Sequence, residues 1–129
     1  MDAQAPVYER LRQELKVGRK QSHWMWFIFP QIAGLGHSPM SVRFAIISLD
    51  EAKAYLTHPV LGARLRECTR LTLRVECKTA RDIFGPIDEI KFHSSMTLFA
   101  RAASDEDLFQ RCIGKYFAGA PDPATIARL

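Results

Sequence analysis

The sequence of 129 residues has no long hydrophobic run. Its longest uninterrupted apolar stretch, residues 24–29, is far shorter than the roughly 20 residues that a membrane-spanning helix requires. The first residues already carry charges, at Asp2 and Glu9, and contain no apolar core of a secretory signal. We therefore expect a soluble, cytoplasmic protein that does not contact a membrane.

Cysteine is scarce, and the three cysteines are scattered and form no CxxC pair. No histidine and cysteine stand at the spacing of a zinc site, so we expect no metal. We interpret Cys68, Cys77 and Cys112 as reduced thiols, each a small core residue rather than a nucleophile.

The sequence also lacks the short motifs of the common nucleotide and hydrolase sites. It contains neither GxGxxG nor GxxxxGK followed by Ser or Thr, which excludes the phosphate-binding loops of the Rossmann and P-loop folds. GxSxG and HExxH are missing too, which excludes the usual α/β-hydrolase and zinc-protease sites. We expect no cofactor.

What is present is an average globular composition, 47% hydrophobic and 25% charged, at a length that favours one domain over residues 1–129. The net charge of +4 and the pI near 9.2 allow an anionic partner without requiring one. A row of arginines, Arg66, Arg70 and Arg74, has no Asn or Gln beside it to read bases. Nucleic acid is therefore not expected as a partner.

Helix starts and stops predict an all-α fold. Ser38, Ser48, Thr79 and Ser104 each stand where a helix N-cap is expected, the last three with an acidic residue three positions on, and Gly18 is a helix stop. No segment alternates long enough for a strand. We expect a single compact domain of about seven or eight short helices. The predicted helices cover residues 6–17, 39–47, 49–58, 59–75, 79–84, 86–102 and 105–117, with a last short one after Asp122.

Residues 18–36, the aromatic segment, contain both tryptophans of the chain and should be threaded between the helices. Trp24 or Trp26 could stack on a nucleobase or sugar, with Lys20 and His23 close enough in sequence to meet a phosphate. The structural alternative is that the aromatic side chains fill the core, with one left at a pocket mouth, and that His23 is a satisfied structural group.

A late helix combines two apolar sides with a polar stripe. Its apolar sides should be Ile87, Ile90 and Leu98 on one and Phe92, Met96 and Phe99 on the other. The stripe, Asp88, Lys91, Ser94 and Ser95, could supply an acid or base, a cation and orienting hydroxyl groups. Equally, Asp88 could satisfy the helix dipole, Lys91 pair with it and the serines bond to the preceding turn. Arg43 is a further candidate anion contact or a structural ion pair.

Three strings resemble the blocks of a bacterial protein family: HWMWFIFPQIAGLGHSPMSVRFAI, SLDEAKAYLTHPVLGARLREC and IFGPIDEIKFHSSMTLFA. Through them the chain is similar to the uncharacterised all-helical proteins called domain of unknown function eighteen-ten, some of which carry the label calpastatin. The resemblance implies one all-α domain and no established activity. The calpastatin label does not suit this composition, since that inhibitor is a long disordered repeat protein. A fainter likeness, by analogy only, is to N-glycosidase-like proteins that act on ADP-ribose conjugates.

We hypothesise that the aromatic segment and the polar stripe face one pocket for a small anionic, nucleotide-like ligand of the ADP-ribose class, with Asp88 as acid or base in a hydrolytic reaction. The alternative is a non-enzymatic interaction module that docks an acidic protein through Arg66, Arg70 and Arg74. The sequence leaves open whether the protein is an enzyme, and its oligomeric state. The candidate ligand-binding residues are Lys20, His23, Trp24, Trp26, Gln31, Arg43, Lys91, Ser94 and Ser95.

Overall fold

The computed structural model describes residues 3–129, within which it contains nine α-helices, one 3-10 turn and no strand. This confirms the all-α fold class and the compact single domain. The elements are η1 (Ala5–Val7), α1 (Tyr8–Val17), α2 (Met25–Ile28), α3 (Pro39–Phe44), α4 (Leu49–Thr57), α5 (Leu61–Arg74), α6 (Ala80–Phe84), α7 (Asp88–Ala102), α8 (Leu108–Phe117) and α9 (Pro123–Ala127). The helix beyond the expected number is α2, which lies inside the aromatic segment.

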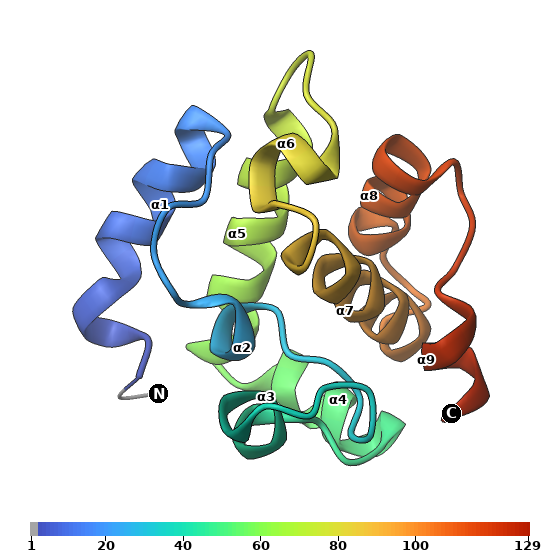
Figure 1. Ribbon diagram of the computed structural model, residues 1–129. Helices are drawn as coiled ribbons and strands as arrows, with labels where there is room; N and C mark the ends of the chain where they lie inside the picture. Colours follow the sequence, from blue (N-terminus) through green and yellow to red (C-terminus); the bar gives the residue numbers. More distant parts are fainter. Residues whose placement is uncertain (1–2) are drawn as a thin grey trace.

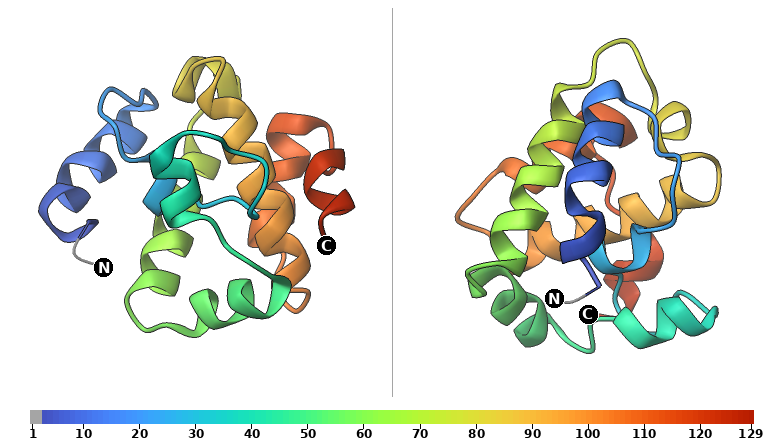
Figure 2. Two further views of the ribbon diagram at one scale, coloured as in Figure 1. Left: turned by 60° about the horizontal axis from the view of Figure 1, so that its bottom comes forward. Right: turned by 90° about the vertical axis from the view of Figure 1, so that its left-hand side faces the viewer.

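Helix α5 runs through the middle of the molecule and contacts α1, α4 and α8 (Figure 1). Helix α7 packs against α4, α6, α8 and α9, so these two helices carry most of the packing. After α1 the chain turns and runs back alongside that helix to α2, as the right-hand view of Figure 2 shows. The aromatic segment is thereby placed against the helical body. Within the described range, no helix is long and apolar enough to cross a bilayer.

Most of the predicted helix ends are correct. The side chains of Ser38 and Ser48 accept hydrogen bonds from backbone amides three residues on, and Thr79 forms a complete capping box with Asp82. Gly18 ends α1 in the left-handed conformation, with φ of 81°.

The start predicted at Ser104 is wrong. Helix α8 begins at Leu108 with Asp107 as its N-cap, so Ser104 lies in the preceding loop. The helix predicted over residues 39–47 ends earlier, at Phe44, because the chain there turns to pair with the aromatic segment. The amide of Ile46 donates to the carbonyl of Gln31 at 2.8 Å, and the Ala33 amide donates to the Ile46 carbonyl at 2.7 Å.

The core is built around phenylalanine rings from three different elements. The ring centroids of Phe29 and Phe92 lie 5.1 Å apart and those of Phe84 and Phe92 lie 4.7 Å apart, and all three side chains are buried. Two cysteines, Cys68 and Cys112, are buried in the same core as predicted, and burial raises the pKa of both thiols to about 12.

Two expectations about burial are wrong. Cys77 is exposed in the loop after α5, where its φ is +60°. At the start of α7, the N-cap residue Ile87 is 71% exposed and Ile90 is 63% exposed, because the first turn of this helix extends beyond the core and burial begins at Phe92. Leu98 is buried as expected. The beginning of α7 is therefore a surface, and it forms one wall of the site described next.

Candidate functional site

The aromatic segment and the start of α7 meet at a cleft of about 390 Å³. We call it the lysine cleft. One side comes from the aromatic segment and the other from the end of α6 and the beginning of α7. The lining residues are Lys20, His23, Met25, Trp26, Phe84, Gly85, Pro86, Ile87, Asp88 and Lys91. Two strings far apart in the sequence thus share one cavity.

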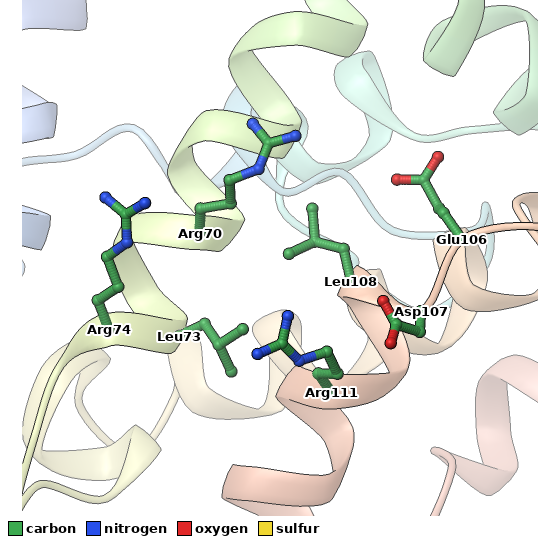
Figure 3. Close-up of a pocket in the computed structure, with 7 residues that line it drawn as sticks. All are labelled: Arg70, Leu73, Arg74, Glu106, Asp107, Leu108 and Arg111. Carbon is green, nitrogen blue, oxygen red and sulfur yellow. The ribbon is translucent and has the colours of Figure 1, made fainter.

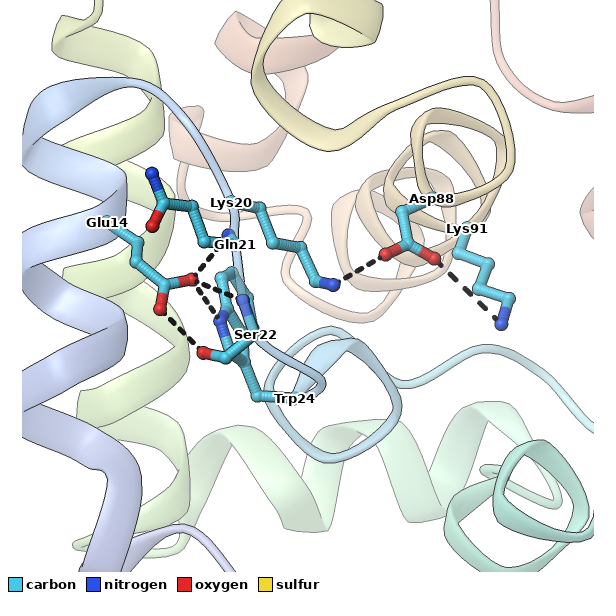
Figure 4. A network of polar contacts seen from close by, with 7 residues as sticks. All are labelled: Glu14, Lys20, Gln21, Ser22, Trp24, Asp88 and Lys91. Carbon is cyan, nitrogen blue, oxygen red and sulfur yellow. Dashed lines mark hydrogen bonds and ion pairs between the residues drawn. The ribbon is translucent and has the colours of Figure 1, made fainter.

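The carboxylate of Asp88 lies between two ammonium groups. Its Oδ2 is 2.8 Å from Nζ of Lys20, which comes from the aromatic segment, and its Oδ1 is 4.0 Å from Nζ of Lys91 on its own helix (Figure 4). The side chains of Lys20 and Asp88 are 9% and 18% exposed. Two lysines face one carboxylate, which leaves one positive charge in excess at the cleft.

The aromatic wall of the cleft is Trp26, which is partly exposed. Its ring stacks against the ring of His23 with 6.4 Å between centroids, and Nζ of Lys91 lies 5.6 Å from its centroid. The indole Nε1 is buried and has no hydrogen-bond partner among the described residues. Trp26 therefore brings a partly exposed ring to a cationic site.

The turn between α6 and α7 shapes the other wall. The capping box of Thr79 and Asp82 starts the short helix α6, and Gly85 ends it with φ of 87° and ψ of 168°. Only glycine adopts this backbone conformation readily. Gly85 thus allows the chain to turn into α7 with Asp88 and Lys91 on the cleft side.

The aromatic segment is held in place by Glu14, a buried residue of α1. Its Oε1 accepts hydrogen bonds from the amides of Gln21 and Ser22 and from Nε1 of Trp24, at 2.8, 3.1 and 2.9 Å (Figure 4). Its Oε2 accepts one from the Ser22 hydroxyl at 2.5 Å. Burial alone would raise the pKa of Glu14, but these bonds, that of Ser22 foremost, lower it to about 2.

A backbone bond completes the attachment, since the Lys20 amide donates to the Ile83 carbonyl of α6 at 2.7 Å. Sequence reasoning did not identify Glu14. It stands on a helix with several other charged residues, such as Glu9, Arg10 and Lys16, and nothing in its spacing separates it from them. Met25, Phe84 and Pro86, which also line the cleft, were likewise not singled out.

Five of the predicted site residues line the lysine cleft: Lys20, His23, Trp26, Asp88 and Lys91. The other five do not. Trp24 is 1% exposed and bound to Glu14, although Nζ of Lys20 lies 5.3 Å from its ring centroid. The Ser94 hydroxyl lies within hydrogen-bond distance of two acceptors, the Ile90 carbonyl at 3.1 Å and the carboxylate of Asp122, the α9 N-cap, at 3.0 Å. These two predictions correspond to structural contacts.

The remaining three candidates also lie outside the cleft. Ser95 is fully buried, and its hydroxyl has no hydrogen-bond partner within residues 3–129. Gln31 belongs to the backbone pairing with Ile46. Arg43 is exposed on α3, and its guanidinium lies 5.1 Å from the ring centroid of Phe44.

The basic face predicted for α5 is only partly free. Arg66 binds the carboxylate of Glu106 through Nε and Nη2 and donates from Nη1 to the Leu56 carbonyl at 2.9 Å. It is therefore occupied within the molecule and does not extend the row formed by Arg70 and Arg74.

Similarity to known proteins bears on the family of this chain. A family profile described as "Protein of unknown function (DUF1810)" matches residues 1–129. The crystal structure of the conserved hypothetical protein Rv1873 from Mycobacterium tuberculosis has 53% sequence identity to this chain and a TM-score of 0.97. The match covers 98% of this chain and 91% of that one. No curated protein matches the chain. The family resemblance inferred from the three sequence strings is confirmed.

Proposed function

We propose that this chain, which belongs to the family described as "Protein of unknown function (DUF1810)", binds a small anionic ligand that carries a planar ring, such as a nucleotide of the ADP-ribose class, in the lysine cleft. The observation that carries the proposal is the position of Asp88 between Lys20 and Lys91, beside the partly exposed ring of Trp26.

Charge and size both support this ligand class. The excess positive charge lies in a partly shielded cleft, where it attracts an anion more strongly than it would in open solvent. Lys91 is 4.0 Å from Asp88, too far for a strong ion pair, so its ammonium group is available to a phosphate. A volume of about 390 Å³ falls within the usual range of small-molecule sites.

The ring of Trp26 supports the aromatic part of the ligand. A base stacked on an aromatic side chain gains about 1–3 kcal/mol. A nucleotide joins a ring to a phosphate over a short distance, which is comparable with the 5.6 Å between the Trp26 ring centroid and Nζ of Lys91.

Asp88 is the acidic residue that lines this cleft. In a hydrolysis of an N-glycosidic bond, its carboxylate would accept a proton from the attacking water as the carbon–oxygen bond forms. It would then return this proton to the nitrogen, which leaves as the carbon–nitrogen bond breaks. Asp88→Asn tests this step, because it keeps the size of the side chain but removes the charge that pairs with Lys20. It should abolish any hydrolysis of an ADP-ribosyl conjugate, and AMP binding, measured on the same variant, should be retained if the cleft stays intact.

Calorimetric titration with AMP, ADP-ribose and uncharged adenosine tests the binding. We expect AMP and ADP-ribose to bind and to raise the Tm, and adenosine to bind more weakly because it cannot use the lysines. Lys91→Gln should weaken AMP binding about tenfold, and Trp26→Leu by a similar factor. Both variants keep the Lys20–Asp88 pair that joins the aromatic segment to α7.

Arg43→Gln is the matched control, since it removes an exposed positive charge on α3 that does not line the cleft. It should bind AMP as the wild type does. The proposal is wrong if no nucleotide binds, or if Lys91→Gln and Arg43→Gln have the same affinity.

A further inference from the structure

A second cleft, of about 510 Å³, lies between the C-terminal half of α5 and the beginning of α8 (Figure 3). We call it the arginine cleft. Arg70 and Arg74 reach it from α5 and Arg111 from α8, with Leu73 and Leu108 between them. Glu106 and Asp107 complete its lining. None of its residues belongs to the lysine cleft.

The three arginines have unused hydrogen-bonding capacity. Within residues 3–129, the guanidinium groups of Arg70, Arg74 and Arg111 form no hydrogen bond or ion pair with the protein, and all three residues are exposed. Neighbouring Arg66 shows the contrast, because it takes up the carboxylate of Glu106. The charge of Glu106 is thus already compensated.

The balance at the arginine cleft is therefore strongly positive. Three guanidinium groups face one uncompensated carboxylate, that of Asp107, which leaves two positive charges in excess. An arginine without an acidic partner is ordinarily solvated, but three that line one cavity repel one another. A bound anion relieves that repulsion.

The start of α8 borders the same cavity. This helix has ten residues, and the side chain of its N-cap, Asp107, accepts no hydrogen bond from the first turn. The first amides of a helix have no partner within the helix and carry part of its positive dipole end. Leu108 and Arg111 of this turn line the cleft, so the positive end of the helix dipole lies beside an anion that the arginines hold.

We propose that the arginine cleft binds the phosphate group of a small ligand. Planar guanidinium groups match phosphate oxygens in pairs, and three of them with a helix start suit one compact, doubly charged group. The short apolar floor of Leu73 and Leu108 leaves room for a small molecule rather than for an extended peptide. The site is separate from the lysine cleft and does not depend on the function proposed there.

Inorganic pyrophosphate, titrated by calorimetry at low salt and followed by amide chemical shifts, tests the proposal. We expect it to bind and to shift the amides of Arg70, Arg74 and the first turn of α8. Each of Arg70→Gln, Arg74→Gln and Arg111→Gln should weaken binding about tenfold, because each removes charge-assisted hydrogen bonds. These side chains are exposed and unpaired, so the variants should fold as the wild type does.

Asp107→Asn should change the affinity for pyrophosphate in the opposite direction. It removes the one uncompensated negative charge while keeping a residue that is equally good at an N-cap, so pyrophosphate should bind more tightly. Arg43→Gln, which removes a positive charge elsewhere on the surface, should leave the affinity unchanged. Comparing ribose 5-phosphate with inorganic phosphate then shows whether an organic ester or the free anion is the better ligand, and binding of either supports the site.

The proposal is overturned if pyrophosphate neither releases heat nor shifts these amides at millimolar concentration. It is also overturned if Arg43→Gln weakens binding as much as Arg74→Gln does, which would indicate a non-specific charge effect. A polyglutamate peptide that binds where pyrophosphate does not would identify the cleft as a docking surface for an acidic protein instead.

Discussion

At the scale of single residues, Glu14 is the clearest example of a charge that holds the structure together. It is 8% exposed and has four hydrogen-bond donors around it. A buried carboxylate is stable only if such donors replace water. Here the donors belong to the aromatic segment, so the same bonds that satisfy the charge fix the segment against α1.

We predict that Glu14 makes stability depend on pH. The pKa of Glu14 in the folded protein, about 2, lies below its ordinary value of 4.5, so its contribution is complete above about pH 5 and is lost as the pH falls through 4.5 toward 2. Glu14→Gln should lower the free energy of unfolding by about 1–3 kcal/mol near neutral pH. Urea unfolding across this range should show the two proteins converging in acid. A constant difference would mean that the charge of Glu14 is not what stabilises the segment.

At the scale of helices, the junction between α4 and α5 depends on a close approach of backbones. A Cβ atom on Gly62 would lie 2.1 Å from the Leu56 carbonyl oxygen, which also accepts a hydrogen bond from Arg66. The His58 ring supports the same junction, since its Nδ1 accepts from the amides of Val60 and Leu61 at 3.1 Å each. Gly62 therefore allows α5 to start directly beside the end of α4.

We predict that Gly62→Ala lowers the free energy of unfolding by about 2 kcal/mol or more, because backbone atoms must move apart. Gly114→Ala is the matched control. It also lies inside a helix, α8, but a Cβ atom there meets nothing within 4 Å, so alanine should stabilise the protein by about 0.5–1 kcal/mol through its higher helix propensity. Thermal and urea unfolding measure both changes, and equal effects would contradict the packing argument.

At the scale of the whole molecule, the phenylalanine cluster joins elements from nearly the full length of the chain. Phe92 is fully buried, and its ring lies within 6.2 Å, between centroids, of the rings of Phe29, Phe84, Tyr116 and Phe117. The aromatic segment, α6, α7 and α8 thus share one core, and we expect them to unfold together.

We predict that Phe92→Ala lowers the free energy of unfolding by about 3–5 kcal/mol in a single cooperative transition. Ile90→Ala, two positions away on the same helix, should change it by less than about 0.5 kcal/mol because Ile90 is 63% exposed. Circular dichroism and tryptophan fluorescence should report the same midpoint for Phe92→Ala. Two separate transitions would show that the aromatic segment and the helices are independent units.

Helix ends and the residues of the lysine cleft differ in how far the sequence predicted them. A helix N-cap acts over three or four residues, so Ser38, Ser48 and Thr79 could be assigned from their neighbours alone. The N-cap predicted at Ser104 was wrong because the loop after α7 extends further and Asp107 occupies the cap position. Among the site residues, the sequence could not separate Trp24 from Trp26. They are only two positions apart, yet Trp24 is buried and Trp26 lines the cleft.

The sequence by itself determined that this protein is a helical domain of its family and that two unusual strings contain its candidate site. Only the tertiary structure decided which residues of those strings are free. The indole N–H of Trp24 is bonded to Glu14 and the Ser94 hydroxyl to Asp122, whereas Trp26 and Lys91 line a cavity. The reason is physical: whether a polar or aromatic group is available depends on partners that the fold brings from distant parts of the chain, and no local pattern encodes them.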